Sequence, residues 1–324
     1  MVSVIITTFN RAGLVCHAIE SVLAQTYTDV EVIVVDDGST DGTESVVRGY
    51  GARVRYMRQG HAGQSSAQNH GMSVATGKYL AHLDSDDLWQ PWHLEQCVQA
   101  LEDDPEIGLV FTDHERFDEH GILMSSFFSA HPSIFGLPCR KVKGKVRVLD
   151  DGLWISLLRE TYVMVGAVVM KTAVFRDVGG FDTRLAYSQD WEYWLRIARA
   201  FPVACICSPS LRVRHHSGNM SGNLAKQKRG EVDVLKLVRR EYPGLEPAVA
   251  GIVRAEIAAR SYDAGYQFFS HGDNKQARLM FQEGWKHGNR NARSVMYWIA
   301  SCLPAGLVRR ARRLKQRLGR GGAA

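Results

Sequence analysis

Short runs of β-branched and other apolar residues recur along the first hundred residues, separated by segments with helical periodicity. Residues 2–7 (VSVIIT) and 30–35 (VEVIVV) have the composition of strands that are buried in a parallel sheet. Between them, Asn10 is expected to cap a helix that gathers its apolar residues on one face. Further strands are predicted at residues 54–57, 79–83 and 107–112, with a helix that begins near Pro91. This alternation predicts an α/β fold.

Regular patterning stops near residue 115 and resumes after residue 160. The segment between them contains a basic run at residues 140–147, and we interpret it as an insertion over one edge of the sheet. From about residue 223 the pattern is helical only, which divides the chain into residues 1–222 and a helical region of residues 223–324. The resumed pattern predicts a strand at 163–170, a helix near 188–200, a strand near 211–214 and one antiparallel helix pair at 255–284.

Polar loops follow three of the predicted strands, at residues 7–11 (TTFNR), 36–43 (DDGSTDGT) and 84–87 (DSDD). Parallel strands bring their carboxyl ends to one edge of the sheet, where such folds bind ligands. An extended segment would place Asp84 and Asp86 on the same side, where two carboxylates repel unless a cation lies beside them. Mg²⁺ prefers oxygen ligands and completes its shell with substrate phosphates. The pattern predicts a site for a metal and a diphosphate; for the middle loop alone, a turn with a helix cap is the other interpretation.

Two common phosphate-binding motifs are absent. No G-x-G-x-x-G follows the first strand, which excludes the phosphate loop of a dinucleotide-binding fold. Residues 71–78 (GMSVATGK) have one residue too many between their glycines for a P-loop, and Tyr79 stands where Ser or Thr would bind Mg²⁺.

Together, these segments resemble the family 2 glycosyltransferases. The resemblance covers roughly residues 1–221 and is carried, in order, by VSVIITTFNR (2–11), VIVVDDGSTDGT (32–43), GKYLAHLDSDDLW (77–89), GGFDTRLAYSQDWEYWLR (179–196) and RHHSGNMS (214–221). It implies the GT-A nucleotide-diphospho-sugar transferase fold, a mostly parallel central sheet with flanking helices, here followed by a helical subdomain. It also implies inverting transfer of a sugar from a nucleotide diphosphate, most simply a UDP-sugar, with dTDP- and GDP-sugars as alternatives.

The resemblance assigns roles to individual residues. Thr7 and Phe9 match positions that line the nucleotide, and Asp37 matches a carboxylate that accepts a hydrogen bond from the base. Asp84 and Asp86 match the D-x-D motif of the family, with Asp84 on the ribose side and Asp86 on a divalent cation, Mn²⁺ or Mg²⁺.

Further along the chain, Asp190 matches the catalytic base of the family. His216 matches a histidine that reaches the metal or the diphosphate. Two positions depart from the pattern: Gln68 stands where an arginine is common at the donor site, and Gln189 stands where a glutamate often precedes the base.

The net charge of +6 is concentrated at the C-terminal end of the sequence. Seven of the 40 Lys and Arg residues lie within residues 309–320, which contain no acid, and the rest of the chain has 33 basic against 34 acidic residues. A nucleic-acid enzyme would more often be basic across its body, so we predict no nucleic-acid partner. Residues 294–320 combine an apolar stretch with this cluster and predict contact with an anionic membrane. A solvated helix packed on the helical region is the other interpretation.

The remaining composition points to a cytoplasmic protein. The six cysteines show no C-x-x-C pair and no zinc spacing, so we expect reduced thiols. The first strand begins at Val2, which leaves no room for a signal peptide, and no apolar stretch is long enough to span a bilayer. We expect a location in the cytoplasm, at the inner face of the cell membrane if the basic segment binds there, and a saccharide or lipid-linked acceptor in cell-surface polysaccharide or glycolipid assembly.

Two other functions stay open at this point. A nucleotidyltransferase also joins a nucleotide-binding sheet to acidic metal ligands, but it would normally carry a glycine-rich, arginine-containing loop where this chain has TTFNRAG. A non-catalytic sugar-nucleotide-binding protein is the second alternative, because Gln68 and Gln189 depart from the family pattern.

Overall fold

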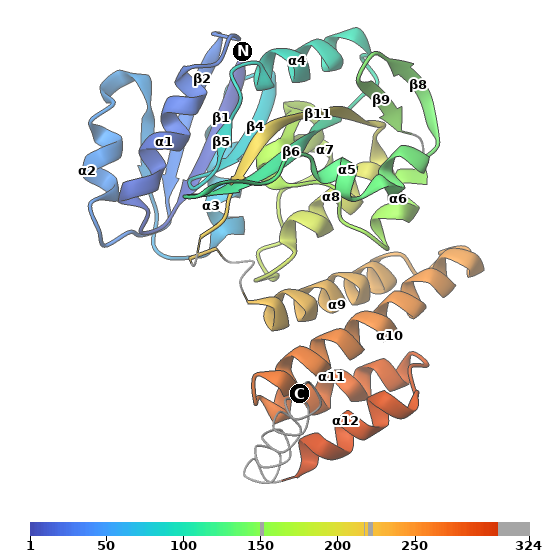
Figure 1. The fold of residues 1–324 in the computed structure, drawn as a ribbon. Coiled ribbons are helices and arrows are strands. Elements are labelled where there is room, and N and C mark those ends of the chain that lie inside the picture. The colour runs from blue at the N-terminus through green and yellow to red at the C-terminus, as the bar shows by residue number, and fades with distance from the viewer. Residues whose placement is uncertain (150–151, 217, 220–222, 304–324) are drawn as a thin grey trace, which may run out of the picture. The chain divides into compact units, whose positions relative to one another are not determined.

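The computed structural model describes residues 1–149, 152–216, 218–219 and 223–303 (Figure 1). The chain divides into two compact units, residues 1–219 and residues 220–324. The first unit is a sheet with helices on both faces, and the described part of the second is helical. The basic cluster at residues 309–320, which is predicted to meet a membrane, lies outside the described residues.

A single 11-stranded sheet organises the first unit, in the order β3-β2-β1-β4-β10-β6-β11-β9-β8, with β5 paired to β11 and β7 to β6. The first four strands are parallel to one another, and β6 is parallel to β11. The other pairs are antiparallel, so the sheet is mixed beyond β4. The strands are Val2–Thr8 (β1), Val30–Asp36 (β2), Arg55–Arg58 (β3), Tyr79–Asp84 (β4), Leu88–Trp89 (β5), Leu109–Asp118 (β6), Gly121–Met124 (β7), Cys139–Lys143 (β8), Val146–Leu149 (β9), Val168–Lys171 (β10) and Val203–Arg214 (β11).

Alternation along the central strands decides which helix each side chain meets. Val32 and Val34 of β2 pack in one cluster with α1 and α4, whereas Ile33 and Val35 pack against Ala67 of α3 on the other face. The α-helices of this unit are Ala12–Leu23 (α1), Thr43–Arg48 (α2), Gln64–Val74 (α3), His93–Asp103 (α4), Phe127–Ala130 (α5), Gly152–Leu157 (α6), Thr172–Val178 (α7) and Gln189–Ala200 (α8).

Three local predictions differ from the structure. Asn10 does not cap α1: it has a φ of 51°, and its Oδ1 accepts a hydrogen bond from Thr40 N at 2.8 Å instead, which ties the first two loops together. The strand predicted at 163–170 begins only at Val168, because residues 165–167 form a 3₁₀ turn. The strand predicted near 211–214 is the end of β11, and the predicted insertion supplies β9 and the edge strand β8.

The second unit consists of α9 (Leu224–Glu241), α10 (Pro247–Ser270), α11 (Asn274–Lys286) and α12 (Ala292–Cys302) in its described part. The predicted pair at 255–284 corresponds to α10 and α11, where Gly265 leaves room for the ring of Phe281: a Cβ there would lie 2.8 Å from it. None of the described helices has the length and apolar character that a membrane span requires.

Candidate active site

The carboxyl ends of β1, β2 and β4 meet at one edge of the sheet. Thr7 lies opposite Asp84 in the register of β1 and β4, and Thr8 lies opposite Asp36 in the register of β1 and β2. Asp36 closes the loop after β2, because its carboxylate accepts a hydrogen bond from Ser39 N at 2.7 Å. The three polar loops of the sequence therefore form one rim.

A turn follows β4, and the two carboxylates of the D-x-D motif, Asp84 and Asp86, contact different side chains. The Asp87 N–H donates to the Asp84 carbonyl at 3.1 Å, so the extended conformation predicted for this segment is wrong. The Asp84 side chain accepts a hydrogen bond from Gln64 Nε2 at 2.8 Å. Asp86 instead faces Arg11 and His216.

Asp86 is the centre of a cluster of three charged or titratable side chains. Its Oδ2 forms an ion pair with Arg11 Nη1 and lies 3.0 Å from His216 Nε2. Asp87 holds the end of β11 beside this cluster, since its carboxylate accepts a hydrogen bond from Arg214 N at 2.9 Å. The structure thus brings the two predicted metal ligands together and adds a guanidinium that the sequence reasoning missed.

Asp84 is linked to the start of α8 through two amide side chains. Gln64 begins α3, and its Oε1 accepts a hydrogen bond from Gln189 Nε2 at 3.2 Å. Burial, together with the charges of Asp86 and Asp190, raises the pKa of Asp84 to about 7. A glutamate at position 189 would place another negative charge in this relay, whereas the neutral amide donates to it. The departure at Gln189 therefore has a structural role.

Asp190 lies half-buried in the first turn of α8. Its Oδ1 accepts a hydrogen bond from Trp191 N at 2.8 Å, and the helix N-terminus favours its negative charge. Burial acts in the other direction and raises its pKa. The charge of Asp190 also raises the pKa of Asp84, so the two carboxylates lie near each other.

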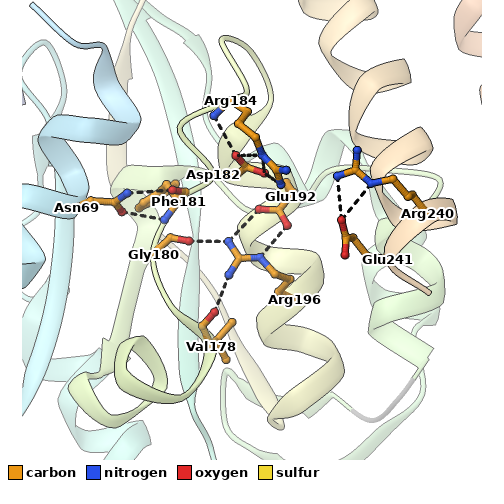
Figure 2. A network of polar contacts seen from close by, with 10 residues as sticks. All are labelled: Asn69, Val178, Gly180, Phe181, Asp182, Arg184, Glu192, Arg196, Arg240 and Glu241. Carbon is orange, nitrogen blue, oxygen red and sulfur yellow. Dashed lines mark hydrogen bonds and ion pairs between the residues drawn. The ribbon is translucent and has the colours of Figure 1, made fainter. Parts of the chain in front are cut away.

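A partly buried ion pair between Glu192 and Arg196, with side chains 8% and 24% exposed, holds α8 in position (Figure 2). Arg196 Nε donates to Glu192 Oε1 at 2.7 Å, and Arg196 Nη2 donates to Glu192 Oε2 at 2.9 Å. The same guanidinium donates to the carbonyls of Val178 at 2.7 Å and Gly180 at 2.6 Å (Figure 2). Gly180 is itself pressed against Asn69 of α3, where a Cβ would lie 2.2 Å from the amide oxygen. These contacts lock α8 to the segment that precedes it and to α3.

Asp37 is buried and organises the loop at residues 59–63. It accepts hydrogen bonds from Gln59 Nε2 at 2.7 Å, Ala62 N at 2.9 Å and Gly63 N at 2.9 Å, and it pairs with His61 Nδ1 at 2.9 Å. A nucleobase that donates to Asp37 would have to replace one of these donors. One of them, the His61 side chain, is 63% exposed. Phe9 stacks on that ring with 4.3 Å between the centroids and is itself exposed.

Gln68, which the resemblance assigns to the donor site, is buried. The side chain is 1% exposed, because the inner face of α3 packs against β1 and β2. Its Nε2 donates to Thr7 Oγ1 at 3.3 Å, and its Oε1 lies 2.6 Å from His82 Nδ1. Gln68 and Thr7 are thus hydrogen-bonded to each other, and both are buried.

Comparison with known proteins gives this chain a family. Residues 3–146 match the model of glycosyl transferase family 2. An uncharacterized glycosyltransferase of Rickettsia felis is 32% identical over 220 residues, which cover 67% of this chain and 34% of that protein. The chain belongs to glycosyl transferase family 2. The family 2 chain thus spans about a third of that relative's length. The chondroitin synthase of Escherichia coli is 35% identical over 132 residues, 40% of this chain and 19% of the synthase.

Solved structures confirm the predicted GT-A fold. TarS of S. aureus, solved in complex with UDP-GlcNAc, aligns with a TM-score of 0.66 at 17% identity and covers 92% of this chain and 84% of its own. The mannosyltransferase PcManGT from Pyrobaculum calidifontis, solved in complex with GDP-Man and Mn²⁺, aligns with a TM-score of 0.58 at 20% identity, over 91% of this chain and 77% of its own. At sequence identities of 17% and 20%, the structural similarity shows the fold of this chain.

Two side chains at the rim have donor atoms that suit a divalent cation. They are Asp86 Oδ2 and His216 Nε2, an oxygen and a nitrogen that form a hydrogen bond of 3.0 Å with each other. Within the described residues of the family 2 chain, no group of three or more His, Cys, Asp and Glu side chains could hold a metal. A cation here would therefore take its other ligands from phosphate oxygens and water.

The shifted pKa of Asp84 predicts a pH-dependent stability in the cation-free protein. Asp84 stays protonated in the fold up to about pH 7, whereas the unfolded chain ionises it near 3.8. Folding therefore takes up a proton between these values, so stability falls as pH rises through them, by at most about 1.4 kcal/mol per pH unit. In urea unfolding at pH 4.5 and 7 with EDTA, we expect Asp84→Asn to reduce this fall. An unchanged fall would mean that another group titrates.

Proposed function

We propose that this protein is an inverting glycosyltransferase that moves a sugar from a nucleotide diphosphate, most simply UDP, to a hydroxyl acceptor. One observation carries the proposal: Asp190 directly follows Gln189, which is linked by hydrogen bonds through Gln64 to Asp84 of the D-x-D motif, so this carboxylate comes from a separate element that is tied to the rim. A base and a cation must both reach the reacting centre, and they must not neutralise each other.

Asp190 would take the proton of the acceptor hydroxyl as that oxygen attacks the anomeric carbon. The bond from that carbon to the diphosphate breaks at the same time, and the diphosphate leaves with the electron pair. General-base catalysis of this kind contributes about 10²- to 10⁴-fold. Asp86 and His216 would hold the Mn²⁺ or Mg²⁺ ion. When bound, that ion supplies positive charge that offsets the charge of the leaving diphosphate.

The donor would lie along the rim formed by β1, β2 and β4. The exposed Phe9, stacked on His61, offers a flat surface for the nucleobase, and Asp37 lies beside it. Asp84 would contact the ribose. TarS was solved with UDP-GlcNAc, which supports UDP, and PcManGT was solved with GDP-Man, which keeps GDP as an alternative.

For the acceptor we propose a saccharide or lipid-linked molecule at an anionic membrane, with the protein at the cytoplasmic face. The solvent face of α12 is apolar, with Val295, Met296, Ile299 and Leu303 between 37% and 52% exposed. The sequence that follows carries the seven Arg and Lys residues of 309–320. An apolar helix face combined with basic residues is typical of peripheral membrane binding, with about 1 kcal/mol for each basic residue near the surface.

Flotation with liposomes tests the membrane contact. We expect the full chain to float with vesicles that contain phosphatidylglycerol and not with pure phosphatidylcholine. Ile299→Glu, or a variant that ends at Leu307, should reduce flotation, because each removes one of the two attractions. Leu279→Glu, at a residue that is 46% exposed on α11, is the matched control. Equal flotation of all variants would refute the proposed contact.

A donor panel tests the enzymatic function. UDP-, GDP- and dTDP-sugars are incubated with the protein and Mn²⁺, and released nucleoside diphosphate is measured for the wild type and for Asp190→Asn. Turnover that depends on Asp190 is the expected result. Nucleotide binding without turnover in either protein would instead indicate a binding protein, and release of pyrophosphate from a nucleoside triphosphate and a sugar phosphate would indicate a nucleotidyltransferase.

A further inference from the structure

Arg11 contacts both side chains that are proposed to hold the cation. It directly precedes α1, and its Nη1 pairs with Asp86 Oδ2 while lying 3.0 Å from His216 Nε2. Its Nη2 donates to the Gly218 carbonyl at 3.2 Å. The Arg11 and Asp86 side chains are 20% and 12% exposed, so the pair is largely shielded from water.

The charge of Arg11 acts on the whole acidic turn after β4. Besides pairing with Asp86, it counteracts the rise in the pKa of Asp84 and of Asp87. In the described part of the chain, the basic groups paired with the Asp86 carboxylate are Arg11 and His216. Arg11 is therefore the permanent positive charge that neutralises this carboxylate before a cation binds.

A divalent cation and this guanidinium cannot occupy the same face of Asp86. Both would contact Oδ2, and two cations within a few ångströms repel strongly in a shielded site. A cation that binds Asp86 and His216 must therefore replace Arg11. The displaced side chain stays close, because the Arg11 backbone N–H donates to Thr43 Oγ1 at 3.1 Å.

The displaced guanidinium would meet the diphosphate that completes the shell of the cation. A guanidinium is suited to phosphate oxygens, since its planar N–H groups form paired hydrogen bonds. We propose that Arg11 is an exchangeable counter-ion: it neutralises Asp86 in the absence of a cation and binds the diphosphate of the donor once the cation has arrived. This inference rests on the proposed function, because it requires the same cation and donor.

Removal of Arg11 then has two effects of opposite sign. Without nucleotide, Arg11→Gln binds Mn²⁺ about three- to tenfold more tightly, because the competing ion pair is lost. With saturating Mn²⁺, Arg11→Gln binds UDP about tenfold or more weakly, because a charged hydrogen-bond partner of the phosphates is lost. Free Mn²⁺ is measured by electron paramagnetic resonance and UDP binding by calorimetry. Arg48→Gln, at an exposed arginine of α2, should change neither affinity.

The other outcomes overturn the proposal in recognisable ways. If Arg11→Gln weakens both affinities, Arg11 only supports the fold of the site. If the wild type binds UDP equally well in EDTA, and Arg11→Gln loses that binding, the guanidinium replaces the cation and is not exchanged for it. Asp86→Asn identifies a failure of the proposed function itself: if Mn²⁺ binds the wild type no better than Asp86→Asn, the cation site is wrong, whatever Arg11 does.

Discussion

Replacement of Asp190 by asparagine is expected to lower the transfer rate by about 10²- to 10⁴-fold, while the affinity for UDP changes less than twofold. Asparagine has the same shape, and its oxygen can still accept the hydrogen bond from Trp191 N. It cannot take a proton from the acceptor. The loss should therefore appear in kcat and not in donor binding, which can be measured by steady-state kinetics beside calorimetry with UDP and Mn²⁺.

The pH profile and a matched variant complete this test. Because burial raises the pKa of Asp190, the wild-type rate should increase with pH until this carboxyl is ionised. The rate of Asp190→Asn should not show this increase. Asp177→Asn, at an exposed aspartate of α7, should keep both rate and profile. If Asp190→Asn retained half of the wild-type rate, another group would be the base.

Replacement of Arg196 by methionine is expected to lower the free energy of unfolding by about 3–5 kcal/mol. The Glu192 side chain is 8% exposed, and without Arg196 its carboxylate would stay buried and lose both hydrogen bonds to that guanidinium. The carbonyls of Val178 and Gly180 would also lose their donor (Figure 2). Urea unfolding followed by tryptophan fluorescence measures the change.

A second variant distinguishes the free-energy cost of an unpaired buried charge from the cost of lost packing. Glu192→Gln combined with Arg196→Met should recover more than about 1 kcal/mol relative to Arg196→Met alone, because no buried charge is left unpaired. Arg48→Met removes a comparable i,i+4 pair with Glu44 at the surface and should cost about 0.5 kcal/mol or less. If Arg196→Met cost no more than Arg48→Met, the buried pair would not hold α8 in place.

Much of the N-terminal half could be predicted from the chain alone. The β-branched runs predict β1 and β2, and the apolar run at 79–83 predicts β4, to within a residue at each end, since buried parallel strands are rich in apolar residues. The carboxyl end of a strand is where ligand groups gather, so the acids after β2 and β4 could be placed on one rim. The edge strand β8 could not be predicted from the sequence. Most of its side chains are exposed to water, so it lacks a clear apolar pattern.

The family resemblance predicted that Asp86 and His216 bind one cation, and the fold brings these two side chains together. The resemblance did not predict their neighbours. Gln68 occupies a donor position of the family, yet it is buried against His82, because the register of α3 on the sheet decides which face of that helix is hidden. Arg11 lies in the first of the motif segments but was given no role there, and Gln64 lies outside all of them.

The sequence by itself therefore determined the central strands β1, β2 and β4, the acidic rim and the residue types available for catalysis, because these depend on local pattern and on chain order. The tertiary structure alone decided the pairings: Gln64 with Gln189 across 125 residues, and Arg11 with His216 across 205. Such pairs form where strand order and helix packing bring distant segments together. A hydrogen bond or an ion pair depends on that distance in space, which local periodicity does not encode.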